Sequence, residues 1–183
     1  MKHKNSFILL SLALIFSLPP VAAYLFFIQK PWLHHAPIYQ GTWISKAHTL
    51  NNLPEQAQWH LFYWQPNPCR SSCIQHLDTL ARIRLALGRK LYSVQQYLAM
   101  TSENLAGQKK TQQSFLKMAD IQTLILTSKN EKFLKQHMSG AAYGIATPQR
   151  EILLLYPIDT PPKALYHDLH LLVSKTPDKR GLS

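Results

Sequence analysis

Residues 59 to 88 read WHLFYWQPNPCRSSCIQHLDTLARIRLALG, and this stretch holds both cysteines of the 183-residue chain. The aromatic and apolar run Trp59–Trp64 ends in the turn-forming residues QPNP, which predicts a buried strand. After Cys73, apolar residues recur at helical spacing as far as Gly88, a residue type that commonly ends helices. The two cysteines are therefore expected on the loop and first helical turn that join a strand to a helix.

The chain beyond this stretch alternates between strand and helix patterns. Apolar runs on either side of the turn TPQR predict a hairpin. The other predicted elements are strands at Leu91–Met100 and Ile121–Thr127, and helices at Thr111–Ala119, from the cap Ser128 to about His137, and from Thr160-Pro161 onward. The order strand, helix, strand, helix, strand, helix, hairpin, helix predicts an α/β domain.

The N-terminal part carries a hydrophobic run. Ser6–Ile28 contains no charged residue, and as a helix it would be ~34 Å long, enough to cross the ~30 Å hydrocarbon core of a bilayer. Lys2 and Lys4 precede it, so the positive-inside rule places the N-terminus in the cytoplasm and the rest outside. A cleaved signal peptide is the alternative, because Val21-Ala22-Ala23 resembles a cleavage site. The apolar run continues beyond that point, which favours a retained anchor.

The sequence thus predicts five segments. Residues 31–58 carry Pro, Gly, Asn and polar residues without sustained periodicity, as linkers do. The segments are a cytoplasmic N-terminus (1–5), a transmembrane anchor (6–28), a tether and lead-in (29–56), the folded domain (57–175) and a flexible tail (176–183). Since a two-cysteine motif can oxidise outside the cytosol, we expect a single-pass protein of the bacterial inner membrane with its domain in the periplasm.

The charge balance is basic, with 20 Lys and Arg against 9 Asp and Glu. Such a balance can indicate nucleic acid or an anionic membrane as the partner. The basic residues are scattered along the sequence, and no stripe alternates aromatic with basic residues as single-stranded nucleic acid would need. The composition therefore argues against nucleic-acid binding and favours a domain beside an anionic bilayer.

Three roles are open for Cys69 and Cys73: a redox pair, a structural disulfide or part of a metal site. A bridge that closes so short a loop removes little entropy from the unfolded chain, which disfavours a purely structural role. A helix N-terminus and the neighbouring Arg70 both stabilise a thiolate. Two thiolates also suit Cu(I), and a neutral imidazole could complete a trigonal site.

Several histidines are candidates for such a site. His76 lies three residues after Cys73 and could be a neighbouring ligand, although a solvated helix residue is the commoner role. His167 and His170 have the spacing of a helical metal pair, but an amphipathic surface is the simpler interpretation. His60, inside the first strand, is expected in the core.

The element order and the two-cysteine motif resemble the thioredoxin fold, an α/β fold with a central mixed β-sheet flanked by helices, here preceded by one transmembrane helix. The C-x-x-x-C pair CRSSC, the N-terminal span and the hairpin AAYGIATPQREILLLYP more closely resemble the Sco/SenC family. Those are membrane-anchored copper proteins that assist cytochrome c oxidase assembly. PCRSSCIQHLDTLARIRLALGRK and YHDLHLLVSK are also similar to small bacterial membrane proteins associated with oxidase-assembly genes.

The resemblance covers about residues 57–175 and implies specific residues. Cys69 and Cys73 would be the redox pair, and together with His137, the histidine before the hairpin, they would bind Cu(I). The sequence departs from the pattern at Ile74, where the family usually has proline, and at His137, which no aspartate precedes. The proline that faces the cysteines in thioredoxin oxidoreductases has no counterpart, because no proline occurs between Pro68 and Pro148.

Three functions follow from the sequence. The first is an assembly factor that delivers copper, or keeps cysteines reduced, for a cytochrome c oxidase subunit or another assembly factor. The second is a membrane-anchored adaptor that has lost its chemistry and only binds a partner. The third is an enzyme, a general periplasmic thiol–disulfide oxidoreductase. The intact cysteine pair favours the first, a metallochaperone or assembly factor rather than a turnover enzyme.

Overall fold

The computed structural model describes residues 12, 14–21, 24–25, 39–55, 58–106 and 110–175. The chain divides into two compact units, Met1–Ile38 and Tyr39–Ser183. Residues 14–21 of the first unit are helical, and no helix among the described residues is long and apolar enough to cross a membrane. The predicted anchor Ser6–Ile28 falls largely outside the described residues, as does the predicted tail 176–183, and both stay predictions.

The second unit is built on a mixed six-stranded sheet in the order β1-β6-β5-β2-β3-β4. Strands β2, β3 and β4 run parallel, while β5, β6 and β1 continue the sheet with antiparallel pairs. The strands are β1 (Thr42–Trp43), β2 (Trp59–Trp64), β3 (Val94–Met100), β4 (Ile121–Ile125), β5 (Ala142–Ala146) and β6 (Ile152–Pro157). The predicted α/β fold with a central mixed sheet is confirmed.

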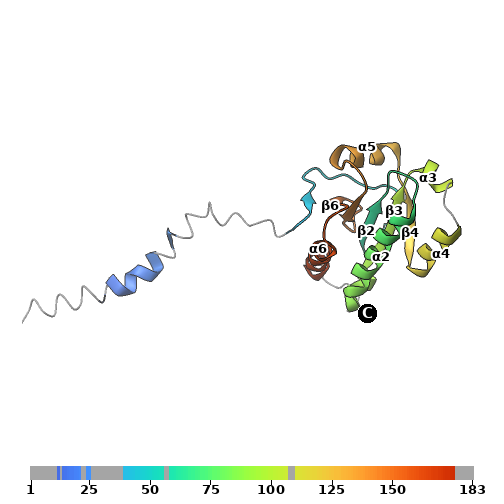
Figure 1. Cartoon of the computed structure of the whole chain (residues 1–183). Coiled ribbons are helices and arrows are strands. Elements are labelled where there is room, and N and C mark those ends of the chain that lie inside the picture. The colour runs from blue at the N-terminus through green and yellow to red at the C-terminus, as the bar shows by residue number, and fades with distance from the viewer. Residues whose placement is uncertain are drawn as a thin grey trace, which may run out of the picture. The chain divides into compact units, whose positions relative to one another are not determined.

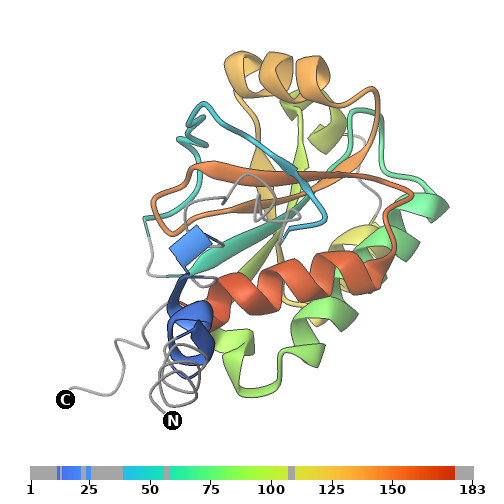
Figure 2. The same ribbon diagram turned by 90° about the vertical axis from the view of Figure 1, so that its left-hand side faces the viewer.

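Helices cover both faces of the sheet, α2 and α6 on one side and α5 on the other (Figures 1 and 2). The helices are α2 (Ser71–Ala86), the 3₁₀ helix η2 (Gly88–Ser93), α3 (Ser102–Ala106), α4 (Lys110–Met118), α5 (Ser128–His137) and α6 (Pro162–Lys175). Side chains alternate along a strand, so β2 contributes to both layers. Leu61 and Tyr63 join the core under α2 and α6, whereas Phe62 and Trp64 join the core under α5.

Several observed elements differ from the predicted ones. The strand expected from Leu91 begins only at Val94, because the 3₁₀ helix η2, which starts at the left-handed Gly88 (φ 58°), extends to Ser93. Helix α3 was not predicted, since it is only five residues long. Thr127 rather than Ser128 caps α5, its hydroxyl accepting a hydrogen bond from the Asn130 N–H.

The described part of the lead-in, residues 39–55, packs with the domain, whereas the sequence predicts a tether over 29–56. Its residues from Tyr39 onward belong to the compact unit, and β1 pairs with β6 at the edge of the sheet. The carboxylate of Asp168, which is 0% exposed, accepts hydrogen bonds from the backbone N–H groups of Gln40 and Gly41 and from the Tyr156 hydroxyl. A buried carboxylate needs such donors, so it fixes the lead-in to α6, and the domain begins near residue 39 rather than 57.

A close contact inside the sheet gives a test of this packing. A Cβ atom added to Gly144 on β5 would lie 2.1 Å from the Phe62 ring of β2, in a core where such overpacking costs about 1–3 kcal/mol. We expect Gly144→Ala to lower the free energy of unfolding by about that much in chemical denaturation. Gly140→Ala is the matched control, because a Cβ there meets nothing within 4 Å. Equal stabilities of the two variants would contradict the described contact.

Candidate functional site

Cys69 and Cys73 form a disulfide with a Cα–Cα distance of 5.3 Å. They lie where the sequence predicts them, Cys69 in the loop after β2 and Cys73 in the first turn of α2. Their exposure differs: Cys69 is half-buried, while Cys73 is 1% exposed and belongs to the core under α2. An incoming group can therefore approach the sulfur of Cys69 far more easily than that of Cys73.

The backbone N–H groups at the start of α2, next to the cysteine pair, have no side-chain cap. The N-cap residue Arg70 makes no side-chain cap, and the described first turn of α2 contains no acidic residue. Helix N-termini carry a partial positive charge from such N–H groups. Because no side chain of that turn neutralises this charge, it can stabilise a thiolate when the disulfide is reduced.

Two side-chain amides hold the cysteine loop from the connection between β3 and β4. Asn104 of α3 donates a hydrogen bond to the Pro66 carbonyl at 2.9 Å. Gln112 of α4 donates one to the Cys69 carbonyl. Neither residue was singled out in the sequence, because nothing in local periodicity signals a contact between segments so far apart. The loop is thus fixed by a crossover that follows it in the chain.

His76 is the histidine whose contacts lie on the same side of the sheet as the disulfide. Its Nδ1 is 2.9 Å from the Tyr143 hydroxyl of β5, and its ring stacks on Tyr63 at 5.5 Å between centroids. Burial lowers the pKa of His76 and raises the pKa of Tyr143 to about 12, so both groups stay neutral near pH 7. Tyr63 in turn donates to Gln65 Oε1. His76 is therefore a bonded, half-buried residue rather than the solvated helix residue that its spacing suggested.

His137 makes its described contacts with Phe133 rather than with either cysteine. It is the last residue of α5, its side chain is exposed, its Nδ1 donates to the Phe133 carbonyl at 2.9 Å, and its ring lies 4.2 Å from the Phe133 ring. Phe133 packs on the α5 face of the sheet, whereas Cys73 packs on the α2 face. Among the residues that the structure describes, no three His, Cys, Asp or Glu side chains could hold a metal ion together. The oxidised pair therefore does not fit the copper centre that the resemblance implies, and copper ligation stays a prediction.

The other candidate histidines, His60, His167 and His170, lie in the core or on the surface of α6. His60 is buried in the core as expected, where burial and the Arg150 charge lower its pKa to about 4. His167 and His170 are exposed on α6. His167 lies 3.1 Å from Asp168 Oδ1, so Asp168 is a buried anchor rather than part of the amphipathic surface expected there.

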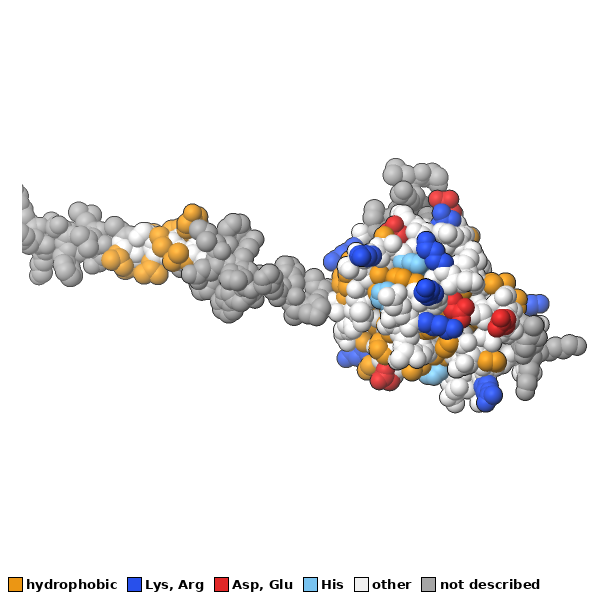
Figure 3. Space-filling view, turned by 90° about the horizontal axis from the view of Figure 1, so that it is seen from above, with side chains coloured by type: hydrophobic (Ala, Val, Ile, Leu, Met, Phe, Trp, Pro, Cys, Tyr) orange, Lys and Arg blue, Asp and Glu red, His pale blue; other side chains and the backbone are white. Residues whose placement is uncertain are grey.

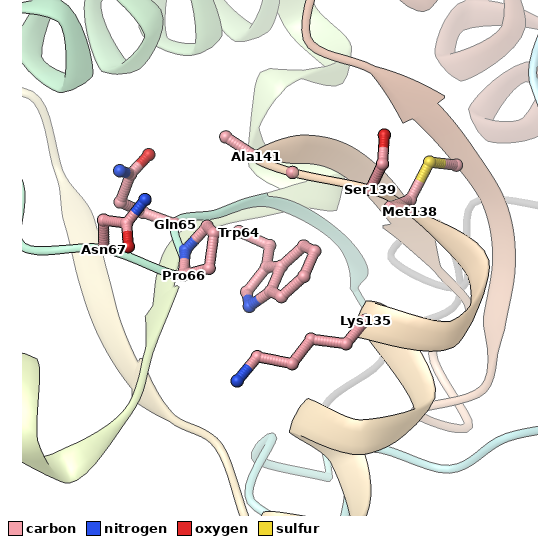
Figure 4. A pocket seen from close by; sticks show the side chains of 9 residues that line it. Trp64, Gln65, Pro66, Asn67, Lys135, Met138, Ser139 and Ala141 are labelled. Carbon is pink, nitrogen blue, oxygen red and sulfur yellow. The ribbon is translucent and has the colours of Figure 1, made fainter.

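A pocket of about 430 Å³ opens beside the segment that leads from β2 to Cys69 (Figure 4). It is lined by Trp64, Gln65, Pro66 and Asn67 from the end of β2 and the loop, by Lys135 and Met138 from α5 and its end, and by Ser139, Gly140 and Ala141 before β5. The Lys135 ammonium pairs with Glu131 at 2.7 Å. Sequence patterns gave no sign of this pocket, because its walls come from three separate segments.

The comparisons with known proteins agree with this architecture. The sequence model of the family described as "Transmembrane-like, thioredoxin-like, C-terminal domain" matches residues 59–175. Comparison with curated proteins finds no match.

Solved structures with a similar fold include three Sco proteins. Apo Sco1 from Thermus thermophilus superposes with a TM-score of 0.53 at 13% identity, covering 73% of this chain and 96% of that one. Yeast Sco1 with copper bound gives 0.50 at 13%, covering 70% and 85%. BsSco, described as a member of the Sco family of cytochrome c oxidase assembly proteins with a disulfide switch, gives 0.50 at 12%, covering 75% and 98%.

At these identities the solved structures establish the fold alone, and the Sco-like thioredoxin fold expected from the sequence is confirmed. The family match extends from β2 to the end of α6 and includes the cysteine loop. The protein belongs to the family of transmembrane-like, thioredoxin-like C-terminal domains.

Proposed function

We propose that the protein is a membrane-anchored, periplasm-facing dithiol–disulfide protein that keeps the cysteines of a client reduced during cytochrome c oxidase assembly. The observation that carries this proposal is the unequal burial of Cys69 and Cys73 at the uncapped N-terminus of α2. The fold shared with BsSco, whose description names a disulfide switch and the Sco family of oxidase assembly proteins, supports the choice of client.

The chemistry is a two-step exchange. In the reduced protein the Cys69 thiolate attacks one sulfur of the client's disulfide, which forms a mixed disulfide and releases one client thiolate. Cys73 then attacks the Cys69 sulfur, which restores the described disulfide and releases the second client thiolate. Two electrons pass from the protein to the client, and the two protons of the protein thiols end on the client's thiols. A dithiol donor outside the cytoplasm returns the pair to its reduced state.

The order of attack can be tested by trapping. Cys73→Ser should accumulate a stable mixed disulfide with glutathione disulfide, because the accessible Cys69 reacts and no resolving thiol follows. Cys69→Ser should react far more slowly, since Cys73 is buried. Intact-mass spectrometry of the reduced full chain after mixing measures both adducts, with Ser72→Ala as the control that keeps both thiols. Faster labelling of Cys69→Ser than of Cys73→Ser would reverse the assigned roles.

Copper delivery is the second candidate function. Two soft thiolates suit Cu(I), and a Sco protein of similar fold is solved with copper bound. When the pair is reduced, Cys69 and Cys73 would hold the ion, and no described histidine stands ready as the third ligand. If neither copper binding nor thiol exchange is found, the adaptor function is the one that remains.

Anaerobic Cu(I) titration against a competing chelator separates these ligand sets. Cys69→Ser and Cys73→Ser should each abolish binding. His137→Ala should leave the affinity unchanged, because its ring packs on Phe133 on the far side of the sheet. A loss of roughly 10- to 100-fold in His137→Ala, as removal of a supporting contact commonly causes, would contradict the described position and restore the ligand set that the resemblance implies. His170→Ala serves as the surface-histidine control.

The location of the domain is the third part of the proposal. The uncharged run Ser6–Ile28 after Lys2 and Lys4 supports an anchor with the domain in the periplasm. Protease added to spheroplasts should digest the domain, while intact cells should protect it. Membrane fractionation and N-terminal sequencing complete the test. A soluble, processed protein that starts near Tyr24 would contradict the anchor.

A further inference from the structure

The pocket and the disulfide lie on the two sides of one loop. Asn67 lines the pocket, and Cys69 follows two residues later in the same loop. The disulfide packs toward the α2 face of the sheet, whereas Trp64 and Met138 of the pocket pack toward the α5 face. A polypeptide segment seated in the pocket therefore passes directly beside the loop that presents the reactive sulfur.

Helix α5, which contributes Lys135 to the pocket wall, is basic. The sequence of α5, SKNEKFLKQH, contains three lysines and one glutamate. Lys129, Lys132 and Lys135 are exposed, and Lys135 itself lines the pocket. Figure 3, which looks onto the face of the domain that carries α5, shows Lys and Arg side chains gathered over its middle. Arg70, next to Cys69, is exposed as well. This distribution favours an occupant with negative charge.

The pocket wall also contains a donor without an acceptor. Among the described residues, the indole N–H of Trp64 is buried and has no hydrogen-bond partner. Buried donors are normally paired. Figure 4 shows this nitrogen and the Lys135 ammonium on the same side of the pocket. An oxygen acceptor that enters there, after a shift of the Lys135 side chain, would meet both groups.

Lys135 is free to change its partner. Its ion pair with Glu131 is an i,i+4 contact in which the lysine side chain is largely exposed. Pairs of this kind contribute little to stability and exchange readily with other carboxylates. The geometry points to a client-binding pocket that selects an acidic segment of the client. A client carboxylate pairs with the Lys135 ammonium and accepts a hydrogen bond from the Trp64 N–H. The client's disulfide then lies beside Cys69. This inference rests on the proposed thiol exchange and names the chemistry of its client.

Paired peptide disulfides test the selection. Two synthetic peptides share one intramolecular disulfide and differ only in flanking residues, Glu in one and Gln in the other. The oxidation rate of the reduced full chain by each peptide is followed by quenched thiol labelling in neutral detergent at low salt. We expect the Glu peptide to react roughly 2- to 5-fold faster, as a single exposed charge pair allows, with the preference disappearing at high salt.

Variants assign the preference to the pocket. Lys135→Gln should remove most of it, and Lys135→Glu should reverse it. Trp64→Phe should reduce the preference for the Glu peptide. Because Trp64 is buried, circular dichroism checks that this variant still folds. Lys117→Glu on α4, an exposed lysine outside the pocket, is the matched control and should keep the preference. Equal rates for both peptides, or a preference that survives in Lys135→Glu, would overturn the inference.

The two proposals fail in distinguishable ways. Bis(2-hydroxyethyl) disulfide is small and carries no carboxylate, so its reaction with the pair does not need the pocket. If it and both peptides leave the reduced pair unchanged, the exchange function is wrong and the inference falls with it. If bis(2-hydroxyethyl) disulfide oxidises the pair in wild type and in Lys135→Glu alike while the peptides show no charge preference, the exchange function stands and the pocket inference alone is wrong.

Discussion

The burial of strand β2 on both of its faces is the constraint on which the rest of the structure depends. All six residues of the strand are buried. Leu61 and Tyr63 fill the layer under α2 and α6, while Phe62 and Trp64 fill the layer under α5. The strand lies in the interior of the sheet, between β5 and β3, where burial on both faces is typical. Its carboxyl end must then turn out between two layers, and this turn is the cysteine loop.

Because the cysteine loop lies between two layers, the groups on its α2 side differ from those on its α5 side. On the α2 side lies the His76–Tyr143 pair, whose groups are neutral and hydrogen-bonded to each other. On the α5 side it meets the pocket with the Lys135 ammonium. Asn104 and Gln112 hold the loop itself through its carbonyls. The loop is thus fixed through its backbone carbonyls.

Sequence patterns could predict the elements that depend on neighbouring residues in the chain. The strand Trp59–Trp64, the turn and the helix after Cys73 follow from apolar spacing within thirty residues, so the cysteines were placed correctly. The lead-in was misassigned as a tether because Asp168 binds the Gln40 and Gly41 amides across more than 120 positions of sequence. His137 is a candidate copper ligand through the resemblance alone. In the structure it is the last residue of α5, and its ring contacts Phe133. The pocket likewise depends on tertiary packing, which no local pattern records.

The separation of the two sides has a consequence for how the site can change. A thiolate at Cys69 depends on the uncapped N-terminus of α2, whereas the charge offered to a client depends on α5, which packs on the opposite face of the sheet. Interactions between exposed charges fade over about 8–10 Å at physiological salt, while the dipole of a helix acts mainly within its first turn. In the proposed function, substitutions on α5 alter the choice of client while the sequence of the first turn of α2 stays unchanged. Reactivity and client choice would then rest on different helices that pack on opposite faces of the sheet.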